Sequence, residues 1–326
     1  MRAIVCKELG PANKLVIEDL EAAALGANDI QVAVKAGGLN FPDTLIIEGK
    51  YQTKPDLPFV PGGECAGVVE AIGDAVTMHK IGDSVVTSGA YGMFQEQVTV
   101  NENAAFPMPS NLDYGQAAGV SLTYMTSYYA LKQRAQLKAG ETLLVLGAAG
   151  GVGITAVEIG KMMGARVIAA ASSEEKLEVA RQAGADECIN YNEQPLKETI
   201  KELTGGAGVN VIYDPVGGDY SEQALRGMAW NGRFLVIGFA SGPIPKIPLN
   251  LTLLKGCSVV GVFWGAFAGI EPQENQQNLK EIWQAFEEGK LKPLITDRFA
   301  FEDFEQAFNC LTERRARGKV ILDIAP

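Results

Sequence analysis

Four glycines in the middle of the chain have the spacing of a turn that binds a dinucleotide. Gly147, Gly150, Gly151 and Gly153 directly follow an apolar run, 142–146, that has the length of a β-strand. Such glycines permit a tight bend, let a pyrophosphate approach the start of a helix, and let that helix pack close to the strand. The chemistry that these residues could perform is therefore the binding of a cofactor phosphate.

The residues after these glycines place the turn in a larger unit. Apolar side chains recur at helical spacing from Val152 to Met163, and the run 167–171 reads as a second strand. Strand, glycine turn, helix and strand in this order predict a βαβ unit that binds a nucleotide. Because glycine-rich turns are common, a plain βα turn without a ligand is the alternative.

The overall composition narrows the class of protein. With 326 residues the chain should form about two domains, and its 47% hydrophobic and 21% charged residues are typical of a soluble globular protein. A net charge of −11 argues against nucleic acid or an anionic membrane as the main partner. The start of the chain reads as a strand rather than a signal peptide, and the longest uncharged stretch, 114–131, is too polar to span a membrane. Five scattered cysteines indicate reduced thiols and a cytoplasmic location.

The composition and the predicted secondary structure change along the chain. The first hundred residues are rich in glycine, proline and short alternating runs, which predicts a β-barrel-like domain. A helical stretch at 114–137 follows, and from 142 to 264 predicted strands and helices alternate, which predicts a parallel sheet with helices on both faces. We expect two helices and a strand beyond residue 266 to return to the first domain. The predicted domains are therefore 1–122 plus 266–326, and 123–265.

Motifs distributed along the chain match one known family. They are Asn40 to Asp43 with Gly49 to Tyr51, Pro61 to Gly67, Gly82 to Val85, Thr126 to Tyr129, 147–153, 172–176 and 314–320. With these motifs in order, the chain resembles the zinc-independent NADPH:quinone oxidoreductases of the medium-chain dehydrogenase/reductase superfamily. The resemblance implies a Rossmann doubly wound parallel sheet inserted in a GroES-like β-barrel-type catalytic domain. It also implies an enzyme that reduces a small quinone or enone substrate with NADPH, as a homodimer.

The residues that would bind a catalytic zinc are missing. Zinc-dependent members of the superfamily carry a cysteine near Asn40 and a histidine at the position of Gly63, and this chain has neither. Its only histidine, His79, is expected in a surface loop, and Glu64 is expected to be a buried structural carboxylate. One histidine and five dispersed cysteines cannot form the usual zinc site, so we expect no bound metal.

The end of the second predicted strand favours NADPH over NADH. Sites specific for NAD place an acidic residue there, whereas this chain has Ser172 and Ser173, followed by Lys176. Hydroxyls and an ammonium bind a 2′-phosphate that a carboxylate would repel. The resemblance implies that Tyr191 and Arg314 border the same phosphate. As an alternative, the serines cap a helix and Lys176 is a solvated surface charge.

Without a metal, the acceptor must already take hydride readily, as quinones and α,β-unsaturated carbonyls do. The resemblance places Asn40 and Thr126 near the nicotinamide and the acceptor, with Tyr51 on the wall of the cleft, and these three are the predicted catalytic residues. Each has a structural alternative. Asn40 would cap a turn, Thr126 would hydrogen-bond within its own helix, and Tyr51 would be a half-buried aromatic side chain. No acid–base pair is evident, so we expect solvent to protonate the product. The residues predicted to contact the cofactor are Asn40, Thr126, Gly150, Gly151, Val152, Gly153, Ser172, Ser173, Lys176, Tyr191, Gly238, Phe263 and Arg314.

Two other functions remain open. An enoyl-thioester reductase would need a basic groove for coenzyme A, and a nucleotide-binding protein with vestigial catalysis would keep the glycines and lose the cleft residues.

The run 258–264 is apolar on both faces, which suits a covered strand whose edge pairs with a second copy of the chain. In a monomer, the loop 265–270 would have to fold over that edge.

Overall fold

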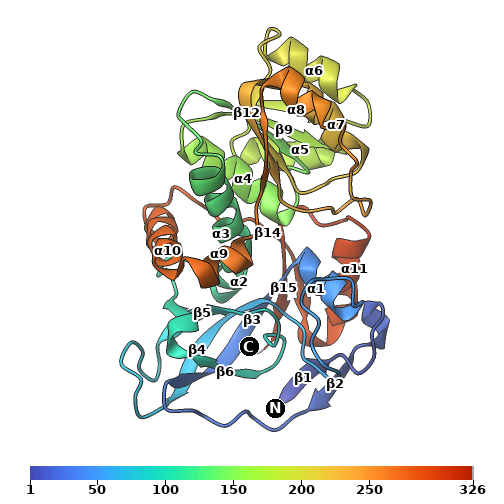
Figure 1. The fold of residues 1–326 in the computed structure, drawn as a ribbon. Coiled ribbons are helices and arrows are strands. Elements are labelled where there is room, and N and C mark those ends of the chain that lie inside the picture. Colours follow the sequence, from blue (N-terminus) through green and yellow to red (C-terminus); the bar gives the residue numbers. More distant parts are fainter. Residues whose placement is uncertain (325–326) are drawn as a thin grey trace. The chain divides into compact units, whose positions relative to one another are not determined.

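The structure is a computed structural model that describes residues 1–324, in which two compact units are distinguished (Figure 1). Unit 1 consists of Met1–Leu122 together with the chain from Lys292 onward. Unit 2 is Thr123–Leu291 and contains the glycine turn. The chain thus leaves unit 1 once, forms unit 2, and returns.

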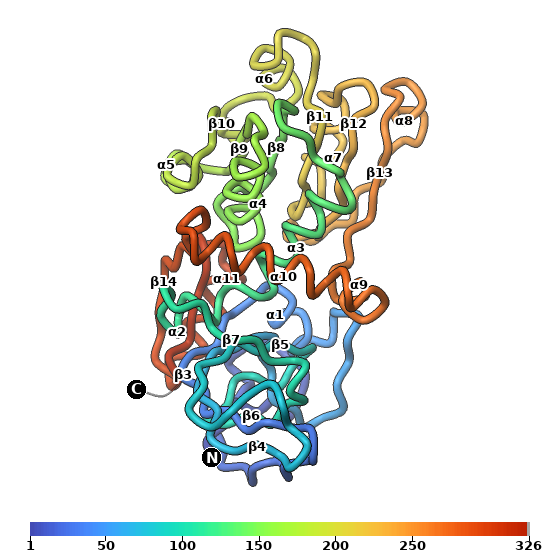
Figure 2. Tube along the Cα trace, turned by 90° about the vertical axis from the view of Figure 1, so that its left-hand side faces the viewer, coloured from blue at the N-terminus to red at the C-terminus, as the bar shows by residue number. Residues whose placement is uncertain are grey.

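The sheet of unit 2 has six parallel strands in the order β10-β9-β8-β11-β12-β13. Figure 2 shows them in this order from left to right. Strands are added first on one side of β8 and then on the other, which is the doubly wound Rossmann topology that the sequence predicts. The strands are β8 (Thr142–Leu146), β9 (Arg166–Ala171), β10 (Glu187–Asn190), β11 (Val209–Asp214), β12 (Met228–Val236) and β13 (Ser258–Gly261).

Helices cover both faces of this sheet because successive side chains of a strand point to opposite sides. Leu143 and Val167 face α4, where Gly160 permits close packing: a Cβ at that glycine would lie 2.6 Å from the Leu143 side chain. Leu144 and Ile168 belong to the core of the opposite face, together with residues of α6 and α7. The helices are α3 (Ser121–Tyr129), which begins at the unit boundary, a π-helical turn (Ala130–Arg134), α4 (Gly151–Met162), α5 (Glu174–Gln182), α6 (Leu196–Leu203), α7 (Asp219–Arg226), α8 (Asn250–Lys255), α9 (Trp264–Ile270) and α10 (Pro272–Glu287).

The second boundary of unit 2 lies after Leu291, not after residue 265 as the sequence analysis placed it. The reason is that α9 and α10 pack on α3. The ring of Phe267 in α9 stacks on Tyr129, with ring centroids 4.1 Å apart, and Phe286 in α10 meets the ring of Tyr124 at 4.9 Å. Ring contacts of this kind depend on residues far apart in sequence, so local composition does not reveal the boundary.

Unit 1 contains a mostly antiparallel sheet of seven strands, in the order β14-β15-β3-β4-β5-β7, with β6 pairing with β3. A separate pair joins β1 to β2. The strands are β1 (Arg2–Val5), β2 (Val16–Asp19), β3 (Asp29–Leu39), β4 (Glu64–Ile72), β5 (Ser84–Ser88), β6 (Gln97–Asn101), β7 (Ala105–Pro107), β14 (Ile295–Ala300) and β15 (Lys319–Asp323). The helices are α1 (Phe41–Ile47), α2 (Tyr114–Ala118) and α11 (Phe304–Thr312), with short 3-10 turns at Ala12–Lys14, Glu102–Ala104 and Phe301–Asp303.

Strand β15 brings the end of the chain into the N-terminal unit. It pairs with β3 in antiparallel register, with Val320 opposite Leu39, so Lys319 lies next to the start of α1. The helical stretch expected at 114–137 is interrupted, because α2 ends at Ala118, with Gly119 as its C-cap, before α3 begins. Among the described residues, no helix is long and apolar enough to cross a lipid bilayer.

Candidate functional site

The glycine turn between β8 and α4 leaves room for a phosphate. Gly147 has φ of +58°, which favours glycine, and a Cβ at Gly153 would lie 2.2 Å from the carbonyl oxygen of Gly147. Gly150 is the N-cap of α4 and has an ordinary φ of −78°; a Cβ there would meet only the oxygen of Gly147, at 3.4 Å. The first turn of α4 has no acidic residue, so its free N–H groups can receive an anion. The turn therefore fits the pyrophosphate of a dinucleotide.

The end of β9 combines two hydroxyls with a cation. Ser173 is the N-cap of α5, and its Oγ accepts the N–H of Lys176 at 3.4 Å. The Nζ of Lys176 donates to Oγ of Ser172, also at 3.4 Å. The first turn of this helix carries Glu174 and Glu175, and Glu174 pairs with Arg181 at 2.6 Å, which offsets part of their negative charge. Ser173 thus caps the helix while Lys176 bonds to Ser172, so the cap does not exclude the phosphate-binding role expected for these residues.

The other predicted cofactor residues are divided between the two units. In unit 2, Tyr191 follows β10, Gly238 follows β12 with its N–H donating to the oxygen of Asp214 at 3.3 Å, and Phe263 is exposed before α9. Arg314 belongs to unit 1, two residues after the end of α11, with φ of +57°.

Thr126 lies on α3, partly exposed, beside a buried group of hydroxyls. The Oγ of its neighbour Ser127 lies 2.8 Å from the Tyr213 hydroxyl and donates to the oxygen of Val152 at 3.0 Å. These bonds join α3 to the first turn of α4 and to β11. The position of Thr126 relative to the glycine turn is therefore maintained within unit 2.

Asn40 belongs to a buried polar cluster in unit 1. Its Oδ1 accepts from Nζ of Lys319 at 2.5 Å, and its Nδ2 donates to Oε1 of Glu64 at 2.8 Å and to the oxygen of Gly38 at 3.2 Å. Glu64 is fully buried; its Oε1 also accepts from Lys319 at 2.5 Å, and its Oε2 accepts the N–H of Leu122 at 2.9 Å. Both amide hydrogens and the oxygen of Asn40 are thus engaged inside the unit.

Asp43 adds a second carboxyl to this cluster. It is 2% exposed, and its Oδ2 accepts the N–H of Asn40, the N-cap of α1, at 2.7 Å. Burial raises the pKa of Asp43 to about 7, although backbone N–H groups and the charge of Lys319 oppose this rise. Tyr51 is half-buried against the core of unit 1, and both its burial and the charge of Asp43 raise its pKa.

Two groups of functional interest were missed from the sequence. Lys319 was only a motif match, although it forms a direct ion pair with Glu64. Asp214, at the end of β11, accepts from the N–H groups of Val216 and Gly217 at 2.8 and 2.9 Å and from the Ser221 hydroxyl at 2.5 Å. Burial raises the pKa of Asp214, against the effect of these hydrogen bonds. The sequence feature that could have identified Asp214 is an acidic residue at the end of a predicted strand, followed by a Pro-x-Gly-Gly turn.

His79 lies in a loop with exposed neighbours, as expected, but its own side chain is buried, at 7% exposed. Its Nε2 lies 3.2 Å from the oxygen of Glu102. The Glu102 carboxylate accepts the N–H groups of Thr77 and Met78, at 2.9 and 2.8 Å, and so draws this loop against the unit. In residues 1–324, no group of three or more histidine, cysteine or acidic side chains is arranged to hold a metal ion.

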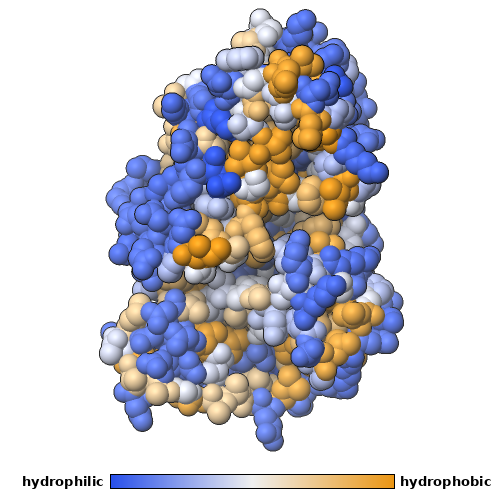
Figure 3. Space-filling view, in the orientation of Figure 1, coloured by the Kyte–Doolittle hydropathy of each residue, from blue (hydrophilic) through white to orange (hydrophobic). Residues whose placement is uncertain are grey.

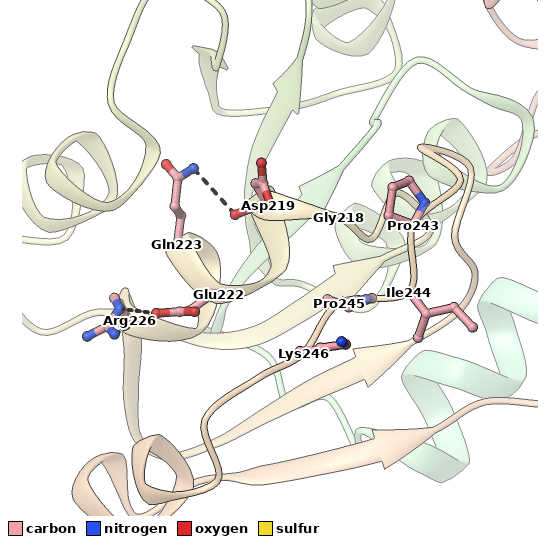
Figure 4. A pocket seen from close by; sticks show the side chains of 9 residues that line it. All are labelled: Gly218, Asp219, Glu222, Gln223, Arg226, Pro243, Ile244, Pro245 and Lys246. Atoms are coloured by element: carbon pink, nitrogen blue, oxygen red, sulfur yellow. Dashed lines mark hydrogen bonds and ion pairs between the residues drawn. The ribbon is translucent and has the colours of Figure 1, made fainter.

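A separate pocket of about 480 Å³ lies beside α7 in unit 2 (Figure 4). Glu222 and Arg226 pair on its helical side at 2.5 Å, and Ile244 and Lys246 come from the opposite segment. None of its lining residues was predicted from the sequence. They are Gly218, Asp219, Glu222, Gln223, Arg226, Pro243, Ile244, Pro245 and Lys246.

Known proteins match both units. The family described as Alcohol dehydrogenase GroES-like domain matches residues 26–110, and the Zinc-binding dehydrogenase family matches residues 151–287. A quinone oxidoreductase-like protein 2 homolog of Nematostella vectensis is 41% identical over 99% of this chain and 88% of its own length. The quinone oxidoreductase of Pseudomonas aeruginosa is 36% identical over 96% of each chain. The chain belongs to the quinone oxidoreductase family of the medium-chain dehydrogenase/reductase superfamily.

Solved structures of this family have the same fold. Escherichia coli quinone oxidoreductase complexed with NADPH has a TM-score of 0.93 at 31% identity, covering 99% of this chain and all of the other. The Pseudomonas syringae quinone oxidoreductase has a TM-score of 0.92 at 35% identity, covering 99% of each chain. The predicted combination of a GroES-like domain and a Rossmann sheet is therefore confirmed. As a quinone oxidoreductase family member, the protein is an oxidoreductase with the fold that binds a nicotinamide cofactor.

Proposed function

We propose that this protein uses NADPH to reduce quinones or other electron-poor α,β-unsaturated carbonyls, by hydride transfer without a metal. The observation that carries the proposal is the end of β9, where Ser172 and Lys176 stand in place of an acidic residue, with Nζ and Oγ 3.4 Å apart. A hydroxyl and an ammonium suit a 2′-phosphate, whereas a carboxylate would repel it. The names of the relatives support a quinone as acceptor.

The residues of the chain would bind and orient the reactants. The nicotinamide, when bound, supplies the hydride. The turn around Gly150 would receive the pyrophosphate, and the end of β9 would receive the 2′-phosphate. Because the polar atoms of Asn40 are engaged with Lys319 and Glu64, we assign Asn40 a positioning role. Tyr51 and Thr126 remain the polar groups proposed to contact the nicotinamide or the acceptor.

Zinc independence is supported by the chemistry of the buried cluster. The position that carries a histidine in zinc-dependent members is Gly63, and a Cβ there would lie 3.6 Å from Oδ1 of Asp43. The ammonium of Lys319 bonds to Glu64 and would repel a divalent cation at that carboxylate. These residues do not fit a zinc ion. Metal analysis after chelator treatment checks this: activity should survive, and stoichiometric zinc whose removal abolishes activity would contradict it.

A panel of acceptors tests the proposed reaction. NADPH and NADH oxidation should be followed with benzoquinone, phenanthrenequinone, an enone and an enoyl-CoA. We expect turnover with the quinones or the enone, and a kcat/KM that is higher with NADPH. Reduction of the enoyl-CoA alone would identify a thioester reductase instead. No turnover with any acceptor, despite tight NADPH binding, would favour a nucleotide-binding protein with vestigial catalysis.

We also propose that the protein is a homodimer joined through β13. This strand ends the sheet, and within one copy of the chain Ser258, Val259 and Gly261 are exposed. Val259 stays 45% exposed although α9 follows β13 closely in the chain, which supports a second copy as the cover of this edge. Figure 3 shows apolar residues gathered on the upper part of the molecule, where Figure 1 places α8. The exposed apolar residues of the segment 228–263, which contains β12, α8 and β13, are Trp230, Ile244, Leu249, Leu253, Leu254, Val259 and Phe263.

An unpaired strand edge can pair with another chain, and a large exposed apolar surface marks an interaction site. A second copy supplies an identical edge, which two-fold symmetry allows to pair in antiparallel register.

The five cysteines are all free, which supports the proposal that the protein works in a reducing compartment such as the cytoplasm.

A further inference from the structure

We infer that Asn192 and Tyr220 position the residues that bind the 2′-phosphate of the cofactor, and that they thereby help the protein distinguish NADPH from NADH. The inference rests on the proposed function, because it concerns the phosphate subsite at the end of β9. Neither residue is proposed to touch the cofactor. Each acts through Ser172 or Tyr191, the two predicted phosphate contacts on either side of this subsite.

Asn192 fixes the backbone of Ser172. Its Nδ2 donates to the carbonyl oxygen of Ser172 at 2.8 Å, and its own N–H donates to Oδ1 of Asn190 at 3.2 Å. A second bond joins the same two segments, since the N–H of Tyr191 donates to the oxygen of Ala171 at 3.1 Å. The loop after β10 is therefore bound to the end of β9 at two successive residues, which holds Ser172 and Tyr191 in one relative position.

Tyr220 supports both sides of this arrangement from α7. Its hydroxyl donates to Oδ1 of Asn192 at 3.3 Å. Its ring lies on the ring of Tyr191, with centroids 4.3 Å apart and planes tilted by 40°. A single side chain thus orients the amide that holds Ser172 and packs against the predicted phosphate-binding tyrosine. Tyr220 directly follows Asp219, the first residue of α7, which Figure 4 shows at the edge of the pocket.

The effect on specificity follows from which ligand uses this subsite. Binding groups that are already ordered lose less conformational freedom when the ligand arrives. A Ser172 or Tyr191 that is less well ordered would therefore bind a ligand with a 2′-phosphate more weakly. NADH has no phosphate at that position, so its affinity should depend little on Asn192 and Tyr220.

Nucleotide fragments test this without requiring turnover. The dissociation constants of 2′,5′-ADP and 5′-AMP should be measured by calorimetry for the wild type, Asn192→Ala and Tyr220→Phe. We expect Asn192→Ala to raise the dissociation constant of 2′,5′-ADP about five- to tenfold and Tyr220→Phe to raise it about two- to threefold. The dissociation constant of 5′-AMP should change less than about twofold. Tyr220→Leu, which also removes the ring contact, should have a larger effect than Tyr220→Phe. Gln223→Ala, one turn further along α7, is the matched control and should change neither constant.

The outcomes separate this inference from the proposed function. If the wild type binds 2′,5′-ADP no better than 5′-AMP, the proposed preference for NADPH fails, and the inference fails with it. If the wild type discriminates and the variants keep the same ratio, the positioning role is overturned while the proposed cofactor stands. If the variants weaken both nucleotides equally, the two residues support the nucleotide domain in general, which also overturns the inference. Unfolding midpoints close to that of the wild type show that each variant is folded.

Discussion

Lys319 donates a hydrogen bond of 2.5 Å to Glu64, and both side chains are buried in unit 1. Removing one partner of such a pair leaves the other charge in a poorly solvating environment. We expect Lys319→Met to lower the free energy of unfolding by about 3–5 kcal/mol, measured by urea denaturation. Combining it with Glu64→Gln should cost less than the sum of the two single variants, because the stranded charge is then removed as well.

The control for this prediction is an ion pair on the surface. Lys290 and Glu288 are 2.6 Å apart with exposed side chains, so Lys290→Met should change the stability by about 0.5 kcal/mol or less. Equal effects of Lys290→Met and Lys319→Met would show that burial of the Lys319–Glu64 pair does not matter.

The buried carboxyl of Asp43 predicts a pH-dependent stability. Its pKa is raised from 3.8 to about 7, so between these values the unfolded chain releases a proton that the folded protein retains. Stability should therefore fall as the pH rises from about 4 to about 7, by roughly 1.4 kcal/mol for each unit of pKa difference. Asp43→Asn keeps an oxygen that can accept from Asn40 but does not titrate. Urea unfolding at several pH values should show this variant gaining stability relative to the wild type as the pH increases; a constant difference would contradict the assignment.

Gly150→Val tests the phosphate turn. With φ of −78° and only one backbone atom near the added Cβ, the folded protein can accept a side chain there. That side chain would occupy the approach to the N–H groups of α4, so we expect NADPH binding to weaken at least about tenfold while the unfolding midpoint stays close to that of the wild type. Calorimetric titration measures the binding. Gly269→Val, at a position where an added Cβ meets nothing within 4 Å, should leave it unchanged.

Lys176→Ala tests the choice of cofactor. If Lys176 contacts the 2′-phosphate, its loss should weaken NADPH by about 1.5–3 kcal/mol and NADH much less. Dissociation constants measured by fluorescence titration of both cofactors check this. The control is Lys201→Ala, an exposed lysine of α6, which should affect neither cofactor. If Lys176→Ala weakened both cofactors equally, Lys176 would be only a surface charge of α5.

The direction of the peptide groups in β13 identifies the residue that tests the dimer. The N–H of Val262 donates to the oxygen of Val236 in β12 at 3.1 Å. Because successive peptide groups of a strand point to opposite sides, Val260 also faces β12, and Val259 faces the free edge. Val259→Pro should remove a hydrogen bond between copies and shift the mass toward the monomer, measured by light scattering at micromolar concentration.

The matched variant for the dimer is Val260→Pro, which should mainly damage the sheet within one copy and lower the unfolding midpoint. A wild-type protein that is already monomeric at micromolar concentration would refute the dimer. The sequence alone could not choose between these two residues, because both are apolar and adjacent.

Much of unit 2 could be predicted because its determining features are local. The glycines after β8, the apolar spacing of α4 and the run that became β9 lie within about thirty residues, and each acts through backbone freedom or periodicity. The hydroxyls at Ser172 and Ser173 follow β9 directly, so their place at the cofactor end of the sheet follows from the topology. The family motifs added the GroES-like domain to this prediction.

The tertiary structure decided which polar groups meet. Asn40 and Lys319 are 279 positions apart in the sequence, yet their atoms are 2.5 Å apart, because β15 pairs with β3. That contact engages the side chain of a predicted catalytic residue, and no local pattern announces it. The burial of His79 and the outward direction of Val259 have the same origin. Sequence spacing encodes the period of a helix or strand, whereas the environment of a side chain depends on the elements that pack against it.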